Sequence, residues 1–428
     1  MTALIAPAPA MRTDATLIGL VGLAHCVSHF SQLLLAPLFP WLKQEFNVSY
    51  AELGLLMSIF FFVSCIVQAV SGFVVDRFSP RPVLYVGLGL LGLAAFGYAV
   101  STSYWMLVAF SVVAGVGNGV FHPVDYTLLN RKVHPSRLGH AFSVHGITGS
   151  LGWALAPALL VPLTLAYSWR VALASAGVLI VAVLVALWLH RGRLALDDVA
   201  AATPPAGAQG AAGTAVGAAG AAAGVPAGAG SLDFLKIPAV WMCFAFFFFY
   251  AASLSGVQVF APEAARLLHG VPEHLAAMCL TIYMVCSAAG MVVGGFLASD
   301  PARCERIVGA GFGAAACIAL LIGLADVPAL AVPVLFGAMG FGAGIAGPSR
   351  DLLVKRSAPD NATGRVYGVV YSGLDIGQAI APLVFGSLMD LQQPSMVWLG
   401  IALVQAVLIV SAFNVRRVRR TSLTATAG

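Results

Sequence analysis

The chain has 428 residues, of which 60% are hydrophobic and only 9% charged, and its mean hydropathy is +0.93. About a quarter of the residues of a soluble protein are charged, so this composition excludes a soluble fold. The net charge of +5 is too small to indicate nucleic-acid binding. Apolar segments of about 20 residues recur along the chain and predict an integral membrane protein embedded in a lipid bilayer. Barrel strands would be shorter and would alternate, so we expect helices.

Twelve spans are predicted in chain order. The first six cover residues 17–40, 51–75, 83–101, 104–130, 139–164 and 169–189. The other six cover residues 238–262, 274–298, 306–325, 328–354, 365–389 and 394–414. We therefore expect an all-α polytopic membrane protein with twelve transmembrane helices.

A segment of different composition separates the two sets of spans. Residues 200–230 are nearly all Ala and Gly, with prolines and no Leu, Ile or Phe, which is typical of a flexible linker. The predicted organisation is an N-terminal tail (1–16), a six-helix half (17–190), a linker (191–236), a second six-helix half (237–414) and a basic tail (415–428).

The two halves share an internal repeat. GVGNGVFHP, which starts at Gly115, reappears as GFGAGIAGP at Gly340, and 340 − 115 gives an offset of 225 residues. Between residues 115 and 157, eight Gly, Pro or Arg residues have a residue of the same type 225 positions later. The first-half residues are Gly115, Gly117, Gly119, Pro123, Arg131, Gly139, Gly152 and Pro157. Their counterparts, in the same order, are Gly340, Gly342, Gly344, Pro348, Arg356, Gly364, Gly377 and Pro382. Repeated helices interrupted by Gly and Pro are typical of a transporter's central site. We predict two pseudo-symmetric halves, with helix kinks at Pro123, Pro157, Pro348 and Pro382.

The distribution of basic residues predicts the orientation. With the N-terminus inside, most of the 22 Lys and Arg residues fall in loops on the inner side, while Lys43, Arg170 and Arg266 fall outside. The positive-inside rule therefore places both termini in the cytoplasm. We expect the protein in a bacterial cytoplasmic (inner) membrane, functional as a monomer.

One loop motif and several segments carry a family resemblance. GFVVDRFSPR, with Gly72, Asp76, Arg77 and Arg81, resembles the loop 2–3 signature of the major facilitator superfamily. HCVSHFSQLLLAPLFP and the FHP at 121–123 resemble its fosmidomycin-resistance-like branch. The resemblance implies a major facilitator fold and a cytoplasmic gate in which the Asp and Arg hold the halves together. Span 4 lacks the arginine of many drug/proton antiporters, and Val124 stands where the branch has an acidic residue.

Span 4 carries three polar residues on one helical face: Asn118, His122 and Asp125. Ionisable groups within a membrane are costly, so they indicate function by default. A histidine one turn from a carboxylate can share a proton with it, and Asp125 is therefore the first candidate for a proton carrier. The alternative is a polar network that only holds span 4 against span 5.

Span 1 carries His25, His29 and Gln32 on one face, which predicts a cavity-lining group or a helix–helix hydrogen bond. Two histidines four residues apart can bind a metal, but no third ligand is evident near them in the sequence, so we predict no metal site. His145 in span 5 is a weaker candidate.

In the second half, the repeat replaces Asn118, His122 and Asp125 with Ala343, Gly347 and Arg350. Arg350 could clamp an anionic substrate or form a structural ion pair. Three further candidates share one face of span 11, namely Tyr371, Asp375 and Gln378, with Asp375 as the second candidate for a proton carrier. Glu263 is expected to be an exposed loop carboxylate.

These features favour a secondary active transporter that works by alternating access, coupled to protons, for a small polar or anionic organic solute or drug. The resemblance favours efflux by antiport, and uptake of an organic anion by proton symport fits the same residues. The sequence contains no HExxH, GxSxG or nucleotide motif, so we expect no enzyme and no cofactor. A receptor, membrane-embedded enzyme or channel is the remote alternative.

Overall fold

The computed structural model describes residues 11–196, 238–298, 303–357 and 364–425. Every regular element in these ranges is helical. The first half contains α1 (Met11–Gln32), α2 (Phe39–Phe46), α3 (Tyr50–Phe78), α4 (Pro80–Ala99), α5 (Tyr104–Asn118), α6 (Phe121–Lys132), α7 (Leu138–Ala166), α8 (Trp169–Leu189) and α9 (Arg191–Leu194). The second contains α10 (Pro238–Val259), α11 (Ala261–His269), α12 (Glu273–Leu297), α13 (Cys304–Leu324), α14 (Val332–Ser357), α15 (Gly364–Asp390) and α16 (Pro394–Ala425).

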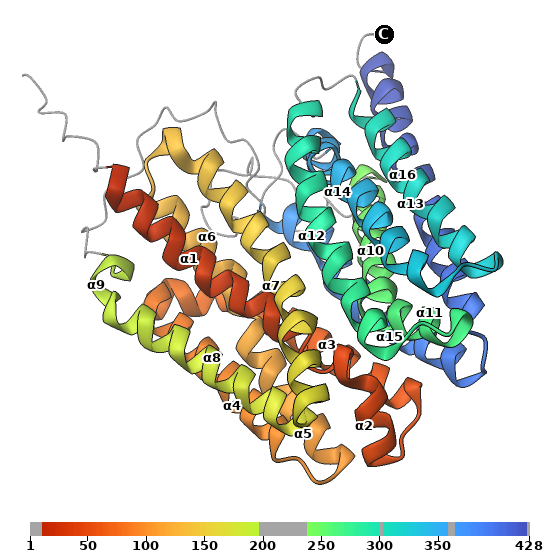
Figure 1. Cartoon of the computed structure of the whole chain (residues 1–428). Helices are drawn as coiled ribbons and strands as arrows, with labels where there is room; N and C mark the ends of the chain where they lie inside the picture. Colours follow the sequence, from red (N-terminus) through yellow and green to blue (C-terminus); the bar gives the residue numbers. More distant parts are fainter. Residues whose placement is uncertain (1–10, 197–237, 299–302, 358–363, 426–428) are drawn as a thin grey trace, which may run out of the picture.

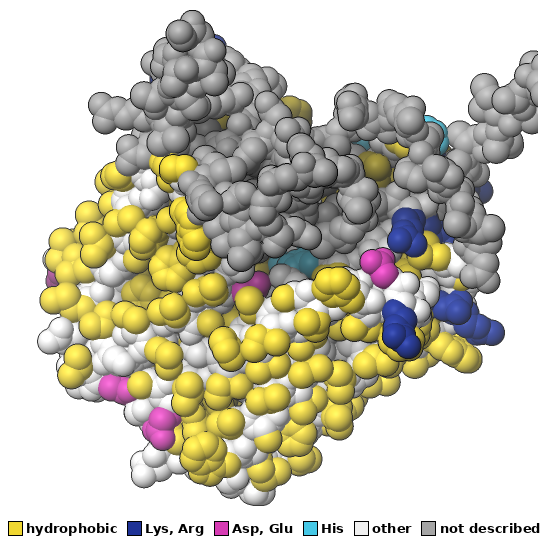
Figure 2. Space-filling view, turned by 180° about the vertical axis from the view of Figure 1, so that it is seen from behind, with side chains coloured by type: hydrophobic (Ala, Val, Ile, Leu, Met, Phe, Trp, Pro, Cys, Tyr) yellow, Lys and Arg dark blue, Asp and Glu magenta, His cyan; other side chains and the backbone are white. Residues whose placement is uncertain are grey.

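The helices confirm the predicted all-α membrane fold. In the described residues, 11 helical segments are long and apolar enough to cross a membrane. The helix α15 occupies the position of the remaining predicted span. Large apolar side chains face outward along these helices, for example Phe73 at 77% exposure and Phe296 at 78%. Figure 2 shows such side chains over much of one face of the molecule. An apolar surface of this extent suits contact with lipid tails. Most of the predicted linker (191–236) lies outside the described residues.

Predicted span 4 is interrupted. It consists of α5 and α6, separated by a turn at Gly119 and Val120. Pro123 lies four residues after Gly119, and a proline ring clashes with the carbonyl group four residues before it, which accounts for the break. Pro157, Pro348 and Pro382 lie inside the continuous helices α7, α14 and α15.

The repeated glycines of α5 and α14 lie where helix backbones nearly touch. A Cβ atom at Gly115 would lie 2.7 Å from the carbonyl oxygen of Phe60 on α3. At the equivalent Gly340, a Cβ atom would overlap the carbonyl oxygen of Tyr283 on α12. The same backbone approach therefore recurs in both halves, as small residues permit between membrane helices.

The second repeated contact joins α7 to α1 and α15 to α10. A Cβ atom at Gly152 would overlap the carbonyl oxygen of Cys26, and one at Gly377 would overlap that of Phe248. Glycines that are 225 residues apart in the sequence therefore lie in equivalent helix pairs of the two halves.

The two halves meet at one end of the molecule. In Figure 1, α7 and α12 lie side by side in the middle and diverge toward the end that carries the C-terminus. At the opposite end, a Cβ atom at Gly386 of α15 would lie 2.7 Å from the carbonyl oxygen of Tyr50 on α3. The Asp390 carboxylate there accepts hydrogen bonds from the backbone N–H groups of Tyr50 (2.7 Å) and Ala51 (2.8 Å). An anion at the N-terminus of a long helix is stabilising, so this contact holds the halves together.

We expect Gly344→Ala to destabilise the protein by about 1–3 kcal/mol, because the added methyl group would overlap the carbonyl oxygen of Ser287 on α12. The measurement is the apparent melting temperature of the purified protein in detergent. Gly313→Ala on α13 is the matched control, since no described residue outside its own stretch of helix lies within 4 Å of its added Cβ. A melting temperature of Gly344→Ala equal to that of wild type and control would contradict the proposed backbone contact.

Candidate functional site

The structure brings four histidines and one carboxylate into a single cluster within the first half. We call it the histidine cluster: His25, His29, His122, His145 and Asp125. Asp125 on α6 is completely buried, and its Oδ2 lies 3.1 Å from His25 Nδ1 and 3.1 Å from His145 Nε2. The rings of His25 and His145 stack with 3.5 Å between their centroids. The helices α1, α6 and α7 therefore meet around this one carboxylate.

His29 and His122 complete the cluster around His25. The ring of His29 lies 4.3 Å from that of His25 and 4.3 Å from that of Trp153 on α7. His122 Nδ1 lies 2.8 Å from Gln68 Oε1 on α3. Sequence reasoning expected no third metal ligand beside His25 and His29, whereas the fold places His122 of α6 next to them.

A second network surrounds Asn118 at the end of α5. Its Oδ1 accepts hydrogen bonds from Ser28 Oγ (2.8 Å) and Gln32 Nε2 (3.4 Å), and its Nδ2 donates to Ser64 Oγ (2.9 Å). Gln32 Oε1 in turn accepts from the indole N–H of Trp153 at 2.9 Å. The amide thus joins α1, α3 and α5, and its main polar atoms are all paired.

A side-chain hydrogen bond beside the histidine cluster crosses from the first half to the second. Gln68 Nε2 donates to Asp375 Oδ2 on α15 at 3.2 Å, while Gln68 Oε1 faces His122. Asp375 thus lies at the interface between the halves, one side chain away from the histidine cluster. Gln378, one turn further along α15, has a buried Oε1 with no hydrogen-bond partner in the described part of the chain. The side chain of Tyr371 lies outside the described residues.

A small cavity lies between the halves, lined by α7 on one side and by α10, α12, α13, α14 and α16 on the other. Trp153 and Ser150 of α7 form its wall on the first half, and Tyr250, Ser287 and Gln405 contribute polar groups from the second.

Arg350 lies beside this cavity. It is on α14, which continues to Ser357, so it is a helical residue rather than a loop residue. Its guanidinium carbon lies 4.1 Å from the centroid of the Tyr250 ring. A cation thus stands next to one wall of the cavity.

The loop motif has contacts within the first half. Asp76 lies 3.6 Å from Arg131 of α6, and both side chains are more than half exposed. Arg77 lies over the ring of Phe78, and Arg81 donates to a backbone carbonyl group of α9. No atom of the described residues lies within 4 Å of a Cβ added at Gly72. In this conformation, the hydrogen bonds and ion pairs of the motif among the described residues stay within the first half.

The expectation for Glu263 was wrong. Glu263 on α11 is 7% exposed, accepts a hydrogen bond from Tyr50 Oη at 2.8 Å and pairs with Arg266 at 2.7 Å. The packing of α11 against α12 and α16, together with the contact from Tyr50 of α3, buries a carboxylate that the sequence alone places at a span end. Sequence reasoning also missed Gln68 and Trp153, although a glutamine inside an apolar span was a usable signal.

A helical membrane protein made of two similar halves with a polar cavity between them has the architecture of a transporter. A family model for the Major Facilitator Superfamily matches residues 21–382 and 247–427. The chain belongs to this superfamily of transporters and is not an enzyme, which confirms the resemblance seen in the sequence.

Similar proteins agree with this assignment. The chain is 29% identical over 150 residues to the fosmidomycin resistance protein of Escherichia coli K12, covering 35% of this chain and 36% of that protein. It is 23% identical over 160 residues to a probable sulfoacetate transporter of Cupriavidus necator H16, covering 37% of each. The chain thus aligns with about a third of the length of these relatives. A bacterial homologue of the human lysosomal transporter Spinster, in an inward-facing and occupied conformation, shares the fold with a TM-score of 0.73 at 13% identity, covering 95% of this chain and 98% of that chain.

We expect Asn118→Ala to lower the stability by about 1–3 kcal/mol, because the substitution leaves buried polar partners on α1 and α3 unpaired. The apparent melting temperature in detergent measures the effect. Asn130→Ala, at an exposed position near the end of α6, is the control and should be close to wild type. Equal melting temperatures for the two variants would show that the Asn118 network does not hold these helices together.

Proposed function

We propose that the protein is a proton-coupled secondary transporter that moves a small polar or anionic organic solute by alternating access. The observation that carries the proton coupling is the hydrogen bond between Gln68 and Asp375, which crosses the interface between the halves. Protonation of a carboxylate removes its negative charge and weakens such a bond. Proton binding at Asp375 would therefore change the relative stability of the two arrangements of the halves, as coupling requires.

Asp375 is preferred over Asp125 for this role because of where the two carboxylates lie. Asp125 is enclosed within the first half, and its partners His25 and His145 belong to that same half. A change at Asp125 acts on the interface only through other side chains. Asp375 contacts the opposite half directly.

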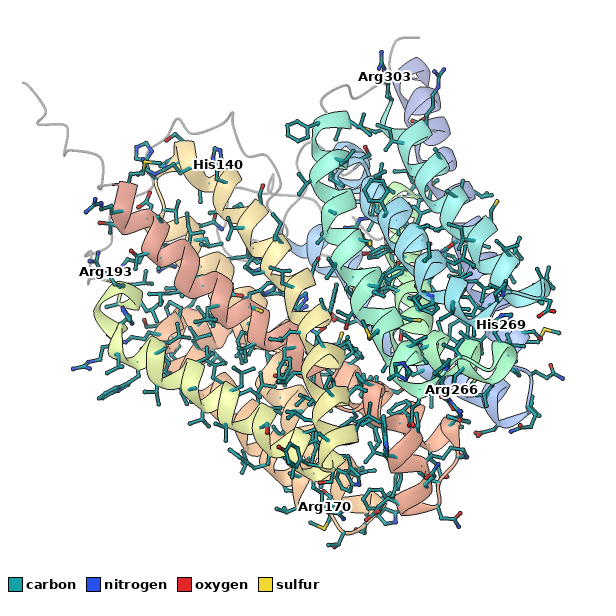
Figure 3. The ribbon with its side chains drawn as sticks, in the orientation of Figure 1. His140, Arg170, Arg193, Arg266, His269 and Arg303 are labelled. Atoms are coloured by element: carbon teal, nitrogen blue, oxygen red, sulfur yellow. The ribbon has the colours of Figure 1, made fainter. Side chains whose placement is uncertain are left out.

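We call the end of the molecule at which Asp390 contacts Tyr50 the closed end, and its contacts support alternating access. Asp390 caps the N-terminus of α3 across the interface, and Tyr50 donates to Glu263 of the second half. Arg266 donates two hydrogen bonds to Glu263, and these bonds raise the pKa of the Arg266 guanidinium. Figure 3 shows Arg170, Arg266 and His269 at this end, and His140, Arg193 and Arg303 at the other. With the predicted orientation, the closed end faces outward and both termini are cytoplasmic.

When the molecule is instead open to the outside and closed on the cytoplasmic side, the exposed Asp76 and Arg77 would hold the cytoplasmic ends of the halves together, as the family resemblance implies. Asp76 is accessible for such a contact because its pairing with Arg131 is solvent-exposed. We place the protein, as a monomer, in a bacterial cytoplasmic membrane.

The cavity supports a polar or anionic solute. Hydroxyl, indole and amide groups line it, and the guanidinium group of Arg350 lies beside its Tyr250 wall. A guanidinium group binds carboxylate and similar anions by paired hydrogen bonds. The name of one relative, a fosmidomycin resistance protein, favours efflux by antiport, and that of another, a probable sulfoacetate transporter, fits an organic anion. Proton-symport uptake is the alternative.

We expect Asp375→Asn to abolish proton-coupled transport, because the amide cannot bind or release the proton. Wild type, Asp375→Asn and Asp326→Asn would be expressed at equal levels in a bacterial host that lacks its own efflux pumps. Their tolerance to fosmidomycin and to a panel of toxic organic acids would be compared. Asp326 is exposed at the end of α13 and serves as the matched carboxylate control.

Raised tolerance with wild type and Asp326→Asn, but not with Asp375→Asn, supports efflux coupled through Asp375. Raised sensitivity in the same two strains supports uptake instead. Full wild-type behaviour of Asp375→Asn would exclude Asp375 as the coupling group.

A further inference from the structure

Three histidines of the cluster have the arrangement of a metal site. His25 and His29 lie one turn apart on α1, and His122 lies near the start of α6. One ring nitrogen from each lies within 4.8 Å of the other two. Imidazole nitrogen is the ligand preferred by Zn²⁺, Ni²⁺, Co²⁺ and Cu²⁺.

The hydrogen-bond partners of two of these histidines determine which nitrogen can bind a metal. His25 Nδ1 faces Asp125 Oδ2, and His122 Nδ1 faces Gln68 Oε1. The carboxylate and amide oxygens accept hydrogen bonds, so each Nδ1 carries the proton and each Nε2 presents a lone pair. The orientation of the Gln68 amide agrees, because its Nε2 donates to Asp375. A ligand histidine whose other nitrogen donates to an oxygen is the usual arrangement around a bound metal.

His29 supplies the independent observation. Both of its ring nitrogens are buried, and neither makes a hydrogen bond of regular geometry with a described residue, although the backbone of Gly149 approaches the ring. Its ring lies between His25 and Trp153, and Gly149 of α7 packs directly against it. Buried polar atoms nearly always have a partner, so two unpaired nitrogens beside two free lone pairs indicate a ligand at this point.

We propose that His25, His29 and His122 bind a divalent transition-metal ion, with Asp125 and Gln68 as the outer partners that orient the ligands. The set His25, Asp125 and His145 is also close enough for a metal, but its atoms already pair with one another at 3.1 Å. A metal there would have to break both contacts. The three-histidine site keeps them and has no oxygen ligand, which disfavours Mg²⁺ and Ca²⁺.

The proposed site is compact enough to close on an ion. Bonds of about 2.0–2.1 Å from Zn²⁺ to nitrogen place tetrahedral ligands roughly 3.3 Å apart. Small rotations of the three rings achieve this from separations of up to 4.8 Å. A fourth position then remains open for water or another ligand. This proposal does not depend on the proton coupling assigned to Asp375.

The test uses the full chain, purified in detergent with a tag that contains no histidine and stripped of metal with a chelator. Binding of Zn²⁺ is measured by titration calorimetry, and binding of Co²⁺ by its visible absorption. We expect one ion per chain, with an affinity at least tenfold weaker in His29→Ala and His29→Gln. Asp125→Asn should weaken binding about 10–100-fold through the orientation of His25. His140→Ala, at an exposed position near the start of α7, is the matched control.

The variants must retain the wild-type elution profile in size-exclusion chromatography, and at least one His29 substitution is expected to do so. Loss of binding in folded His29 variants, with full binding in His140→Ala, supports the site. The proposal is overturned if wild type binds neither ion at micromolar concentration, or if a folded His29 variant binds as tightly as wild type.

Discussion

The close approach of helix backbones at repeated glycines is the constraint on which the rest of this structure depends. Lipid tails are as apolar as the side chains they touch, so burial from water does not hold membrane helices together. Packing has to do so, and packing improves when backbones can touch. Gly115 against Phe60, and Gly340 against Tyr283, provide this contact in the two halves. The glycines recur at equivalent positions because the helices of both halves pack in the same way.

Within that common frame the polar contents differ. The first half holds the histidine cluster, with Asp125 completely buried. The second half has Gly347 and Arg350 at the positions equivalent to His122 and Asp125. Glycines carry the packing, so these neighbouring positions are free to vary without loss of the fold. The result is a cavity with a titratable cluster behind one wall and a cation beside the other. Trp153 contacts both the histidine cluster and the cavity, since its ring lies 4.3 Å from that of His29 and also lines the cavity.

The fold was predictable from the sequence because its signals are local. Span length and proline positions depend on residues close together in the chain, and the break before Pro123 follows from one ring. The glycine repeat is visible when the chain is compared with itself. The site was predictable only in part. The spacing of residues along each helix predicted that His25 and His29 share one face and that Asn118 and Asp125 share another. It did not indicate which helix faces contact each other. The contact of Asp125 with His25, and that of Gln68 with Asp375, joins helices far apart in sequence. Glu263 was misjudged for the same reason, because the tertiary packing that buries it leaves no mark on its neighbours in the chain.

A polar network whose hydrogen bonds are all made within the protein is structural, whereas a network with unpaired buried atoms has room for a ligand. The side-chain oxygen of Asn118 accepts two bonds and its nitrogen donates one, so this network is satisfied by the protein alone. The histidine cluster is not, since Asp125 Oδ1 and both nitrogens of His29 are buried without partners in the described chain. Unpaired polar atoms are costly in an apolar medium, so a fold that keeps them needs a compensating partner. A bound cation would supply that partner to one of the His29 nitrogens, and the Asp125 carboxylate nearby would offset part of its charge.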